Sequence, residues 1–350
     1  LYDGLAGLAL FFAAFGKVSD SEQAKKILHA VCISLFKYTD ELFLGKRDFS
    51  KECVGGFLGE ASLLYAYTVL YKLSGEVVFL QYAQKHFSVV AKLVDKDENY
   101  DILFGNAGAI LAIVALYKVT ADEKLLDCAE KAAHILVKNQ SSSGGWKVGD
   151  ESHFLAGFSH GAAGIIYSLA MLYSVRPKYY LQEAMHKGLS FENTLYDSAM
   201  NNWKDVRDDV PEGHWMWAWC HGPAGILLSR MQMITVVSAQ DRKVIQEDMV
   251  KCAQALENNV LDNNCLCHGN LGNTEILESY ARAIKDKTLY KKAMRIRSCV
   301  VESLIDGTAD CGEMYLYGYQ FPGFMTGLAG MGYSLLKDID SDLPCILGLQ

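Results

Sequence analysis

The 350-residue sequence predicts an all-α protein, an α/α toroid built from seven helical-hairpin repeats. Two observations lead to this fold class. A Gly-x-x-Gly motif followed by an apolar run recurs along the chain, and charged, helix-favouring segments separate the copies. A helix that is apolar on most sides packs against neighbours all round, whereas an amphipathic helix is half exposed. Alternating the two kinds in series most simply closes into a double ring with the apolar helices inside.

The seven motifs open the predicted inner helices, at intervals of 47 to 61 residues that leave room for two helices and two loops each. Their first glycines are, in order, Gly4, Gly56, Gly105, Gly161, Gly222, Gly269 and Gly327. A second glycine follows each of them after two residues. We expect these small residues to let the inner helices approach one another where they begin. Pro223 lies in a first helical turn and marks one such start.

Six amphipathic segments between the motifs predict the outer helices. Ser19 with Glu22, and Thr120 with Glu123, match capping boxes at the starts of two of them. Because the chain opens directly on an inner helix, the seventh outer helix would lie upstream of Leu1. We therefore expect a chain that is truncated at its N-terminus or that follows another domain.

The composition of the chain excludes several classes of protein. The net charge is -8 and no Lys/Arg-rich run occurs, which argues against nucleic acid as a partner. The apolar runs are too short to cross a bilayer, so no membrane span is predicted. The chain has ten cysteines, but disulfide frameworks belong to small domains with thin cores. Four of them fall within amphipathic helical patterns and are predicted to be buried thiols in a cytoplasmic protein: Cys32, Cys128, Cys252 and Cys299.

The residues just before each motif should meet at one end of the ring, because all the inner helices begin there. Three consecutive repeats carry histidine at the same offset, at His160, His221 and His268, and two of them add Cys220 and Cys267. Cys220, Cys267 and His268 would give a catalytic zinc site its three protein ligands and leave one tetrahedral position open. The alternative is that these cysteines only cap helices in a dry interior.

Other residues at this rim leave the ligand set and the chemistry partly open. Cys265 competes as third ligand, because "CLCH" could bind through either thiol, but it lies two residues off the repeat register and is predicted to be a supporting or structural residue. His221 could replace His268 as ligand, and otherwise it is a candidate base or substrate contact. His160 has no cysteine beside it and is the acid/base candidate.

Two aspartates precede motifs. Asp101 lies four residues before Gly105 and approaches the same rim. A catalytic role for Asp101 and a role in accepting backbone N–H bonds at a helix start are equally compatible with this position. Asp3, directly before Gly4, is predicted to be only a helix cap.

Two polar loops that contain tryptophan, residues 139–150 and 201–220, are longer than a turn needs. They would overhang the rim, where aromatic faces could hold an extended peptide. Alternatively, they pack their own tryptophans as ordinary surface loops.

Taken together, the seven repeats and the stretches "GFSHGAAGI", "WCHGPAGI", "CHGNLGN" and "GFMTGLAG" resemble the lanthionine synthetase C-like (LanC-like) family from Leu1 to Leu336. The chain is most similar to the cyclase domain at the C-terminal end of class II lanthipeptide synthetases. The resemblance implies an α/α toroid with zinc held at Cys220, Cys267 and His268. By matching motifs, Asp101 and His160 fall on the family's acid/base positions.

The resemblance also implies the reaction and its partners. The thiol of a peptide cysteine adds to dehydroalanine or dehydrobutyrine and closes a thioether ring. The substrate would be a precursor peptide that carries cysteine and dehydrated serine or threonine. Residues 1–350 would form a single cyclase domain, with a dehydratase domain upstream in the same polypeptide.

One position departs from the family pattern. Single-domain cyclases tend to carry an arginine one turn before the first zinc cysteine, and Met216 stands at that place here. The sequence therefore leaves open which side chain stabilises the substrate, or the enolate that forms when the thiolate adds to the double bond. His221 and His214 are the candidates.

Three other functions compete with this one. A LanC-like protein that adds glutathione or another thiol to dehydrated residues would use the same metal. A zinc-stabilised peptide-binding scaffold would lack catalysis. A carbohydrate-acting hydrolase is disfavoured, because such sites depend on paired carboxylates.

Overall fold

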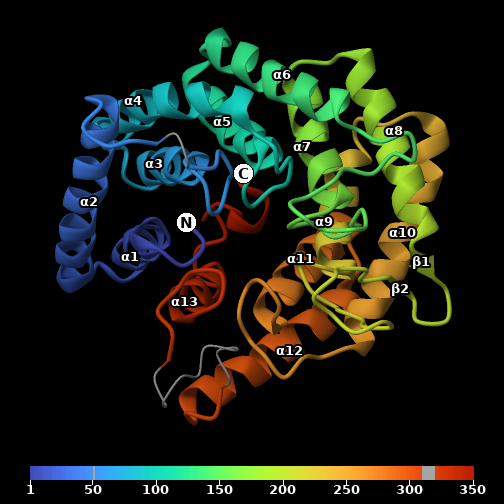
Figure 1. Ribbon diagram of the computed structural model, residues 1–350. Helices are drawn as coiled ribbons and strands as arrows, with labels where there is room; N and C mark the ends of the chain where they lie inside the picture. The colour runs from blue at the N-terminus through green and yellow to red at the C-terminus, as the bar shows by residue number, and fades with distance from the viewer. Residues whose placement is uncertain (50–51, 310–319) are drawn as a thin grey trace.

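The computed structural model describes residues 1–49, 52–309 and 320–350, and these form thirteen α-helices in two concentric rings (Figure 1). The inner ring consists of α1 (Leu5–Ser19), α3 (Ala61–Ser74), α5 (Asn106–Thr120), α7 (Ala162–Val175), α9 (Pro223–Met233), α11 (Asn270–Ala283) and α13 (Leu328–Leu336). Each inner helix contacts the next one, and α13 contacts α1, so the ring is closed. The predicted all-α toroid is confirmed.

The outer helices are α2 (Glu22–Phe43), α4 (Val77–Leu93), α6 (Glu123–Lys138), α8 (Tyr179–Thr194), α10 (Ala239–Asn258) and α12 (Lys287–Ile305). Each packs on the inner helix that precedes it in the chain. A short hairpin, which the sequence did not suggest, joins β1 (Tyr196–Asp197) to β2 (Asn202–Trp203), with Tyr196 opposite Trp203. Two 3-10 turns complete the described elements, η1 (Val94–Lys96) and η2 (Ile346–Gly348).

The Gly-x-x-Gly motifs lie where the inner helices begin. Six of these helices start directly after the first glycine, and α3 starts two residues after Gly59. A Cβ atom at Gly108 would clash with the carbonyl oxygen of Ile102, six residues earlier, and with the backbone of Gly56 in the neighbouring repeat. The contact with the carbonyl six residues earlier recurs at the second glycine of the other motifs: Gly7, Gly59, Gly164, Gly225, Gly272 and Gly330. The expected approach between repeats therefore occurs, and a local fold-back of the loop adds a second demand for glycine.

A closed circuit of backbone hydrogen bonds joins the seven loops that precede the inner helices. Each loop donates an N–H group to a carbonyl of the next repeat, and the seventh donates back to the first. The bonds run from Tyr2 to Phe57, Gly56 to Ile102, Ile102 to Ser159, Ser159 to Cys220, Cys220 to Cys267, Cys267 to Met325 and Met325 to Tyr2, at 2.7 to 3.2 Å. This circuit fixes the side chains at one rim relative to one another.

Asp3 takes part in closing the ring and is not the helix cap that the sequence suggested. The helix that follows it has no side-chain cap at Gly4. Asp3 Oδ2 instead accepts the hydroxyl of Thr326 at 2.9 Å, and its Oδ1 accepts the backbone N–H of Thr326 at 3.3 Å. The carboxylate thus ties the first repeat to the seventh.

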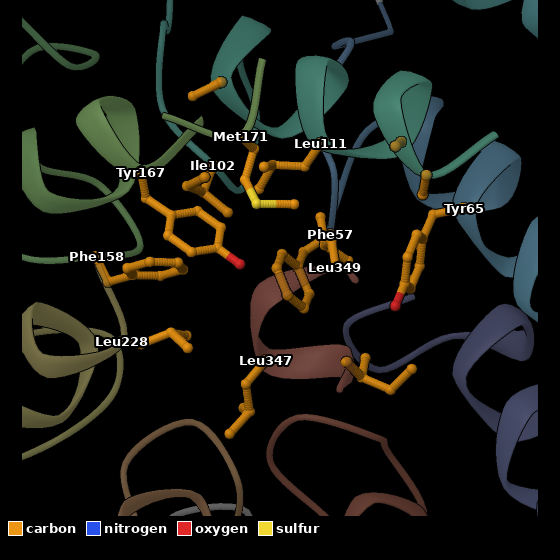
Figure 2. Packing of buried hydrophobic residues seen from close by; sticks show 14 of the residues in the cluster. Phe57, Tyr65, Ile102, Leu111, Phe158, Tyr167, Met171, Leu228, Leu347 and Leu349 are labelled. Carbon is orange, nitrogen blue, oxygen red and sulfur yellow. The ribbon is translucent and has the colours of Figure 1, made fainter. Parts of the chain in front are cut away.

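The centre of the inner ring is filled by the C-terminal segment around η2, which no sequence motif indicates. Figure 2 shows Leu347 and Leu349 among inward-facing aromatic side chains, and both are 1% exposed. The backbone carbonyls of this segment are satisfied by side chains of the surrounding ring. Tyr65 donates to Gln350, Tyr167 to Gly348, Trp219 to Leu347 and Tyr333 to Pro344.

The two predicted capping boxes are wrong. Helix α2 is capped by Ser21 and α6 by Asp122, whose side chains accept backbone N–H bonds of the first turns. Ser19 and Thr120 instead belong to the ends of the preceding inner helices, where their hydroxyls donate to carbonyls four residues earlier. A hydroxyl in a last helical turn has such a carbonyl within reach, and this bond competes with capping.

The predicted buried thiols are partly borne out. Cys32 and Cys252 are buried and Cys128 is half-buried, but Cys299 lies on the exposed face of α12. The nine described cysteines form no disulfide, and Cys311 lies outside the described residues. Within the described part of the chain, no helix has both the length and the apolar character needed to cross a bilayer.

Candidate metal centre

Three soft or borderline donors meet at the rim where the inner helices begin. The Sγ atoms of Cys220 and Cys267 and a ring nitrogen of His268 all lie within 4.8 Å of one another. Cys220 precedes α9 and Cys267 precedes α11, and the hydrogen bond from Cys220 N to the Cys267 carbonyl holds the two loops together. Tetrahedral zinc, with bonds of about 2.0–2.3 Å, would keep such donors about 3.5 Å apart. The three side chains are therefore within reach of one ion.

The surroundings of the thiols also fit a cation. Burial raises the pKa of Cys267 well above its usual range, and the neighbouring Cys220 raises it further. Two adjacent buried thiolates repel each other, so a positive ion would be needed for both to ionise. Two sulfurs and an imidazole match zinc, whereas magnesium and calcium take oxygen ligands. The residues present thus fit a zinc ion.

The two alternative ligands, Cys265 and His221, lie outside this group of three donors. Cys265 is fully buried, and its sulfur accepts the backbone N–H of His268 at 3.4 Å. Burial raises the pKa of Cys265 to about 12, so it stays a thiol. This arrangement agrees with the supporting role expected for Cys265, since its bond holds the backbone of His268.

His160 and Asp101 form a pair beside this centre. His160 Nδ1 lies 2.6 Å from Asp101 Oδ2, while Oδ1 of the same carboxylate accepts the N–H groups of Phe104 at 2.7 Å and Gly105 at 3.1 Å. Asp101 therefore accepts backbone N–H bonds at a helix start, and its contact with His160 leaves a catalytic role a prediction. Because the carboxylate accepts at Nδ1, the proton sits there and Nε2 is left for a substrate.

The imidazole of His160 is open to solvent on one side. Its side chain is 26% exposed, whereas Asp101 is fully buried. His160 lines a cleft of about 430 Å³ together with Phe104, Leu155 and the acidic residues of two loops. Cavities of this size accommodate small ligands or peptide side chains.

His221 is buried next to His160, and their rings stack with centroids 5.9 Å apart. Burial lowers the pKa of His221 to about 3, with the positive charge of Arg207 contributing, so the imidazole is neutral. A neutral, enclosed imidazole can orient its neighbours through hydrogen bonds. The role of His221 as a base or substrate contact stays a prediction.

Met216 contacts the centre through sulfur, with its Sδ 3.9 Å from Cys220 Sγ. The guanidinium of Arg207, which the sequence did not indicate as a site residue, lines the same cleft as His160. Arg207 forms two parallel hydrogen bonds to Asp205, at 3.0 Å from Nε and 2.8 Å from one terminal nitrogen. Arg207 lies in a loop rich in charges of both signs, so no local pattern could have singled it out.

The two loops bury three of their five tryptophans, Trp146, Trp203 and Trp219, whereas Trp215 and Trp217 are half-buried. Trp146 and Trp203 are each 2% exposed, and the Trp146 indole donates to the Leu136 carbonyl at 2.7 Å. Trp203 packs on Tyr196 of the β-hairpin, with centroids 4.9 Å apart. These two tryptophans are therefore not free to hold a peptide. The second loop does line a further cleft of about 470 Å³, which includes His214.

The fold and the donors together define a helical toroid with a candidate zinc centre at one rim. The family model described as "Lanthionine synthetase C-like protein" matches residues 1–347, and the chain belongs to this family. The LanC-like family and the toroidal fold expected from the motifs are confirmed.

A curated relative is the "Lacticin 481/lactococcin biosynthesis protein LcnDR2" of Lactococcus lactis subsp. lactis. The two are 24% identical over 355 residues, which cover 97% of this chain and 36% of the relative. The chain thus spans little more than a third of the relative's length.

Among solved structures, the chain resembles "Nisin cyclase" with a TM-score of 0.75 and 17% identity, over 100% of this chain and 91% of that one. A "sugar epimerase from ruminal bacterium" gives a TM-score of 0.53 at 13% identity, over 82% and 87%. At these identities the likeness concerns the fold alone.

Proposed function

We propose that this chain is a zinc-dependent peptide cyclase that forms lanthionine or methyllanthionine rings. A peptide cysteine thiolate adds to dehydroalanine or dehydrobutyrine within a lanthipeptide precursor. The observation that carries the proposal is the meeting of three donors within 4.8 Å of one another. Cys220, Cys267 and His268 would hold the zinc, and family membership supports this set.

Cys220, Cys267 and His268 would hold the zinc, which would lower the pKa of the substrate thiol, about 8.5 when free, and so favour the thiolate for attack. The chain's own contribution is to hold the two ligand sulfurs in a buried rim, with exposures of 7% for Cys220 and 3% for Cys267. Water is largely excluded from these two atoms, so charge interactions at the centre are strengthened.

The addition forms a bond between sulfur and the β-carbon of the dehydro residue. The π electrons of the double bond move towards the neighbouring carbonyl as an enolate, and the α-carbon must then receive a proton. His160 is the donor in this proposal, because Asp101 fixes its Nδ1 and leaves Nε2 for the cleft. To act as this donor His160 would carry a proton on Nε2, and the Asp101 carboxylate would hold the ring through Nδ1 during the transfer.

The partners belong to the proposal as well. The substrate would be a precursor peptide with cysteine and dehydrated serine or threonine. Residues 1–350 would be one cyclase domain, and a dehydratase domain would precede it in the same polypeptide. The greater length of the curated relative, of which the chain covers 36%, supports this arrangement.

The test combines metal analysis with a mass-spectrometric assay of free thiols on a dehydrated precursor peptide. We expect Cys220→Ala and Cys267→Ala to lose stoichiometric zinc and cyclisation while remaining helical by circular dichroism. Cys32→Ala, which removes a buried thiol of α2, is the matched control and should keep both. Ring formation by either variant without bound metal would contradict the proposal.

The same assay separates the other functions. Glutathione adducts that form faster than rings would indicate an enzyme that adds glutathione or another free thiol to the dehydrated residue. Binding of the precursor with full zinc content but without ring closure would indicate a scaffold.

A further inference from the structure

The Tyr2 hydroxyl lies 2.7 Å from Cys267 Sγ and has no part in the proposed mechanism. Tyr2, Cys220 and Cys267 occupy the same register, two residues before the first glycine of their motifs. Backbone hydrogen bonds through Met325 place Tyr2 next to Cys267, although 265 residues separate them in sequence. The first repeat therefore reaches the metal centre without supplying a ligand.

The position of Tyr2 is fixed on both sides. Its backbone N–H donates to the Phe57 carbonyl at 3.0 Å, and its carbonyl accepts from Phe324 at 3.1 Å and Met325 at 2.7 Å. Its ring meets the Phe57 ring edge to face, with centroids 6.4 Å apart. The hydroxyl is thus directed at the sulfur by a clamped backbone and a packed ring.

The two ligand sulfurs have different surroundings. Cys267 has the Tyr2 hydroxyl, whose pKa burial raises well above its usual range, so that it stays protonated and can donate. Cys220 has the thioether of Met216 at 3.9 Å, which carries no proton to donate. A thiolate that accepts a hydrogen bond shares a lone pair with the donor, and this lowers its nucleophilicity.

This difference matters for a side reaction of the proposed chemistry, the alkylation of a ligand sulfur. The dehydro residue is an electrophile that approaches three sulfurs, of which only the substrate sulfur should react. Attack by Cys267 would form a bond from its Sγ to the β-carbon and move the π electrons to the carbonyl oxygen. Once the α-carbon gained a proton, the protein would be alkylated at a ligand and the centre lost.

We propose that Tyr2 is a positioning residue whose hydroxyl donates to Cys267 Sγ, holds this ligand sulfur in place and suppresses its reaction with the dehydro residue. The choice of electrophile rests on the proposed function. The hydrogen bond to a metal-bound sulfur does not, so the two can be tested separately.

The first experiment uses the cobalt-substituted protein. Tyr2→Phe should bind one equivalent of cobalt like the wild type, but its sulfur-to-cobalt charge-transfer band should move to lower energy, because Cys267 loses a donor. Fluorotyrosine in place of Tyr2 is a stronger donor and should move the band the other way. Tyr65→Phe, which removes another buried hydroxyl far along the chain, is the control and should leave the band unchanged. An unmoved band in Tyr2→Phe, or loss of its metal, would overturn the proposal.

The second experiment measures reactivity. The zinc-loaded proteins are incubated with N-acetyl-dehydroalanine amide without added thiol, and adducts are mapped by peptide mass spectrometry. Cys267 should be alkylated about ten-fold faster in Tyr2→Phe than in the wild type, as expected for loss of a charge-assisted hydrogen bond, while the rate at Cys220 stays the same. Equal rates at Cys267 in both proteins would refute the role of Tyr2.

Controls separate the possible failures. If Tyr2→Phe does not fold, Tyr2→Met fills the same space without a donor and takes its place. If the wild type binds metal but closes no rings, the proposed function fails, and the cobalt band still decides whether Tyr2 donates to the ligand.

Discussion

His160 Nδ1 lies 2.6 Å from one oxygen of Asp101, whose other oxygen holds the backbone at the start of α5. The candidate proton donor is thereby anchored to the inner ring through a single carboxylate. In Asp101→Asn the amide oxygen can keep the backbone bonds, but the NH2 group would present a donor to Nδ1 and reverse the tautomer.

We expect Asp101→Asn to slow cyclisation by about 10²- to 10⁴-fold, the usual contribution of a positioned acid or base. Zinc content should be unchanged, and the free energy of unfolding should fall by only about 1 kcal/mol, because the cap is retained. Rates come from mass spectrometry and stability from urea titration. A variant with wild-type rates would show that the pair only supports the helix start.

His160→Ala removes the proposed proton donor itself. Cyclisation should fall by about 10²- to 10⁴-fold with full zinc content, since His160 is outside the three-donor group. Solvent deuterium incorporation at the α-carbon, followed by mass spectrometry, should become slow and lose stereochemical preference. Full cyclisation by this variant would exclude His160 as the donor.

Gly108→Ala tests why the motif needs its second glycine. The added methyl group would clash with the Ile102 carbonyl and with Gly56, so we expect the free energy of unfolding to fall by about 1–3 kcal/mol or more. Gly4→Ala is the matched control, because a Cβ there has no neighbour within 4 Å. Its effect in urea titration should stay within about 1 kcal/mol. Equal losses in the two variants would contradict the steric explanation.

Leu347→Ala tests the C-terminal segment as part of the core. Leu347 is 1% exposed at the centre of the ring, so truncation should lower the free energy of unfolding by about 2–5 kcal/mol. Leu44→Ala, at a leucine that is 61% exposed, should change it by no more than about 0.5 kcal/mol. Thermal and urea unfolding of both variants gives the comparison. A small effect at Leu347 would mean that the ring does not depend on this segment.

Glu192→Gln tests a buried charge cluster that joins α8, α9 and α10. Glu192 and Asp248 share the guanidinium of Arg230, at 2.9 and 3.1 Å. Burial raises the pKa of Glu192 from 4.5 to about 7, and Asp248 adds to the rise. The stability that protonated Glu192 contributes is therefore complete below about pH 4.5 and is lost as the pH rises through 7.

In Glu192→Gln the decline in the free energy of unfolding between pH 4.5 and 7 should be smaller than in the wild type. Urea titrations at several pH values measure the slope. The same slope in both proteins would show that Glu192 is already ionised at the lower end of this range.

Much of the candidate site could be predicted because the repeat carries its own geometry. Cys220 and Cys267 each lie two residues before the first glycine of their motif and His268 lies one residue before it, and such positions in successive repeats place side chains at one rim. The capping boxes failed because short patterns do not distinguish the end of one helix from the start of the next. The sequence also could not decide whether Trp146 and Trp203 face a peptide or the core, since either arrangement suits a tryptophan in a polar loop.

The sequence by itself determined the toroid, the order of its inner and outer helices and the three donors, because helical periodicity and repeat spacing are local properties. Closure of the ring placed Tyr2 against Cys267 across 265 residues, through hydrogen bonds between loops that no local pattern encodes. Packing of neighbouring loops brought Asp101 to His160 across 59 residues. The position of the C-terminal segment likewise depends on the tertiary structure, because its leucines fill a space that seven helices enclose together.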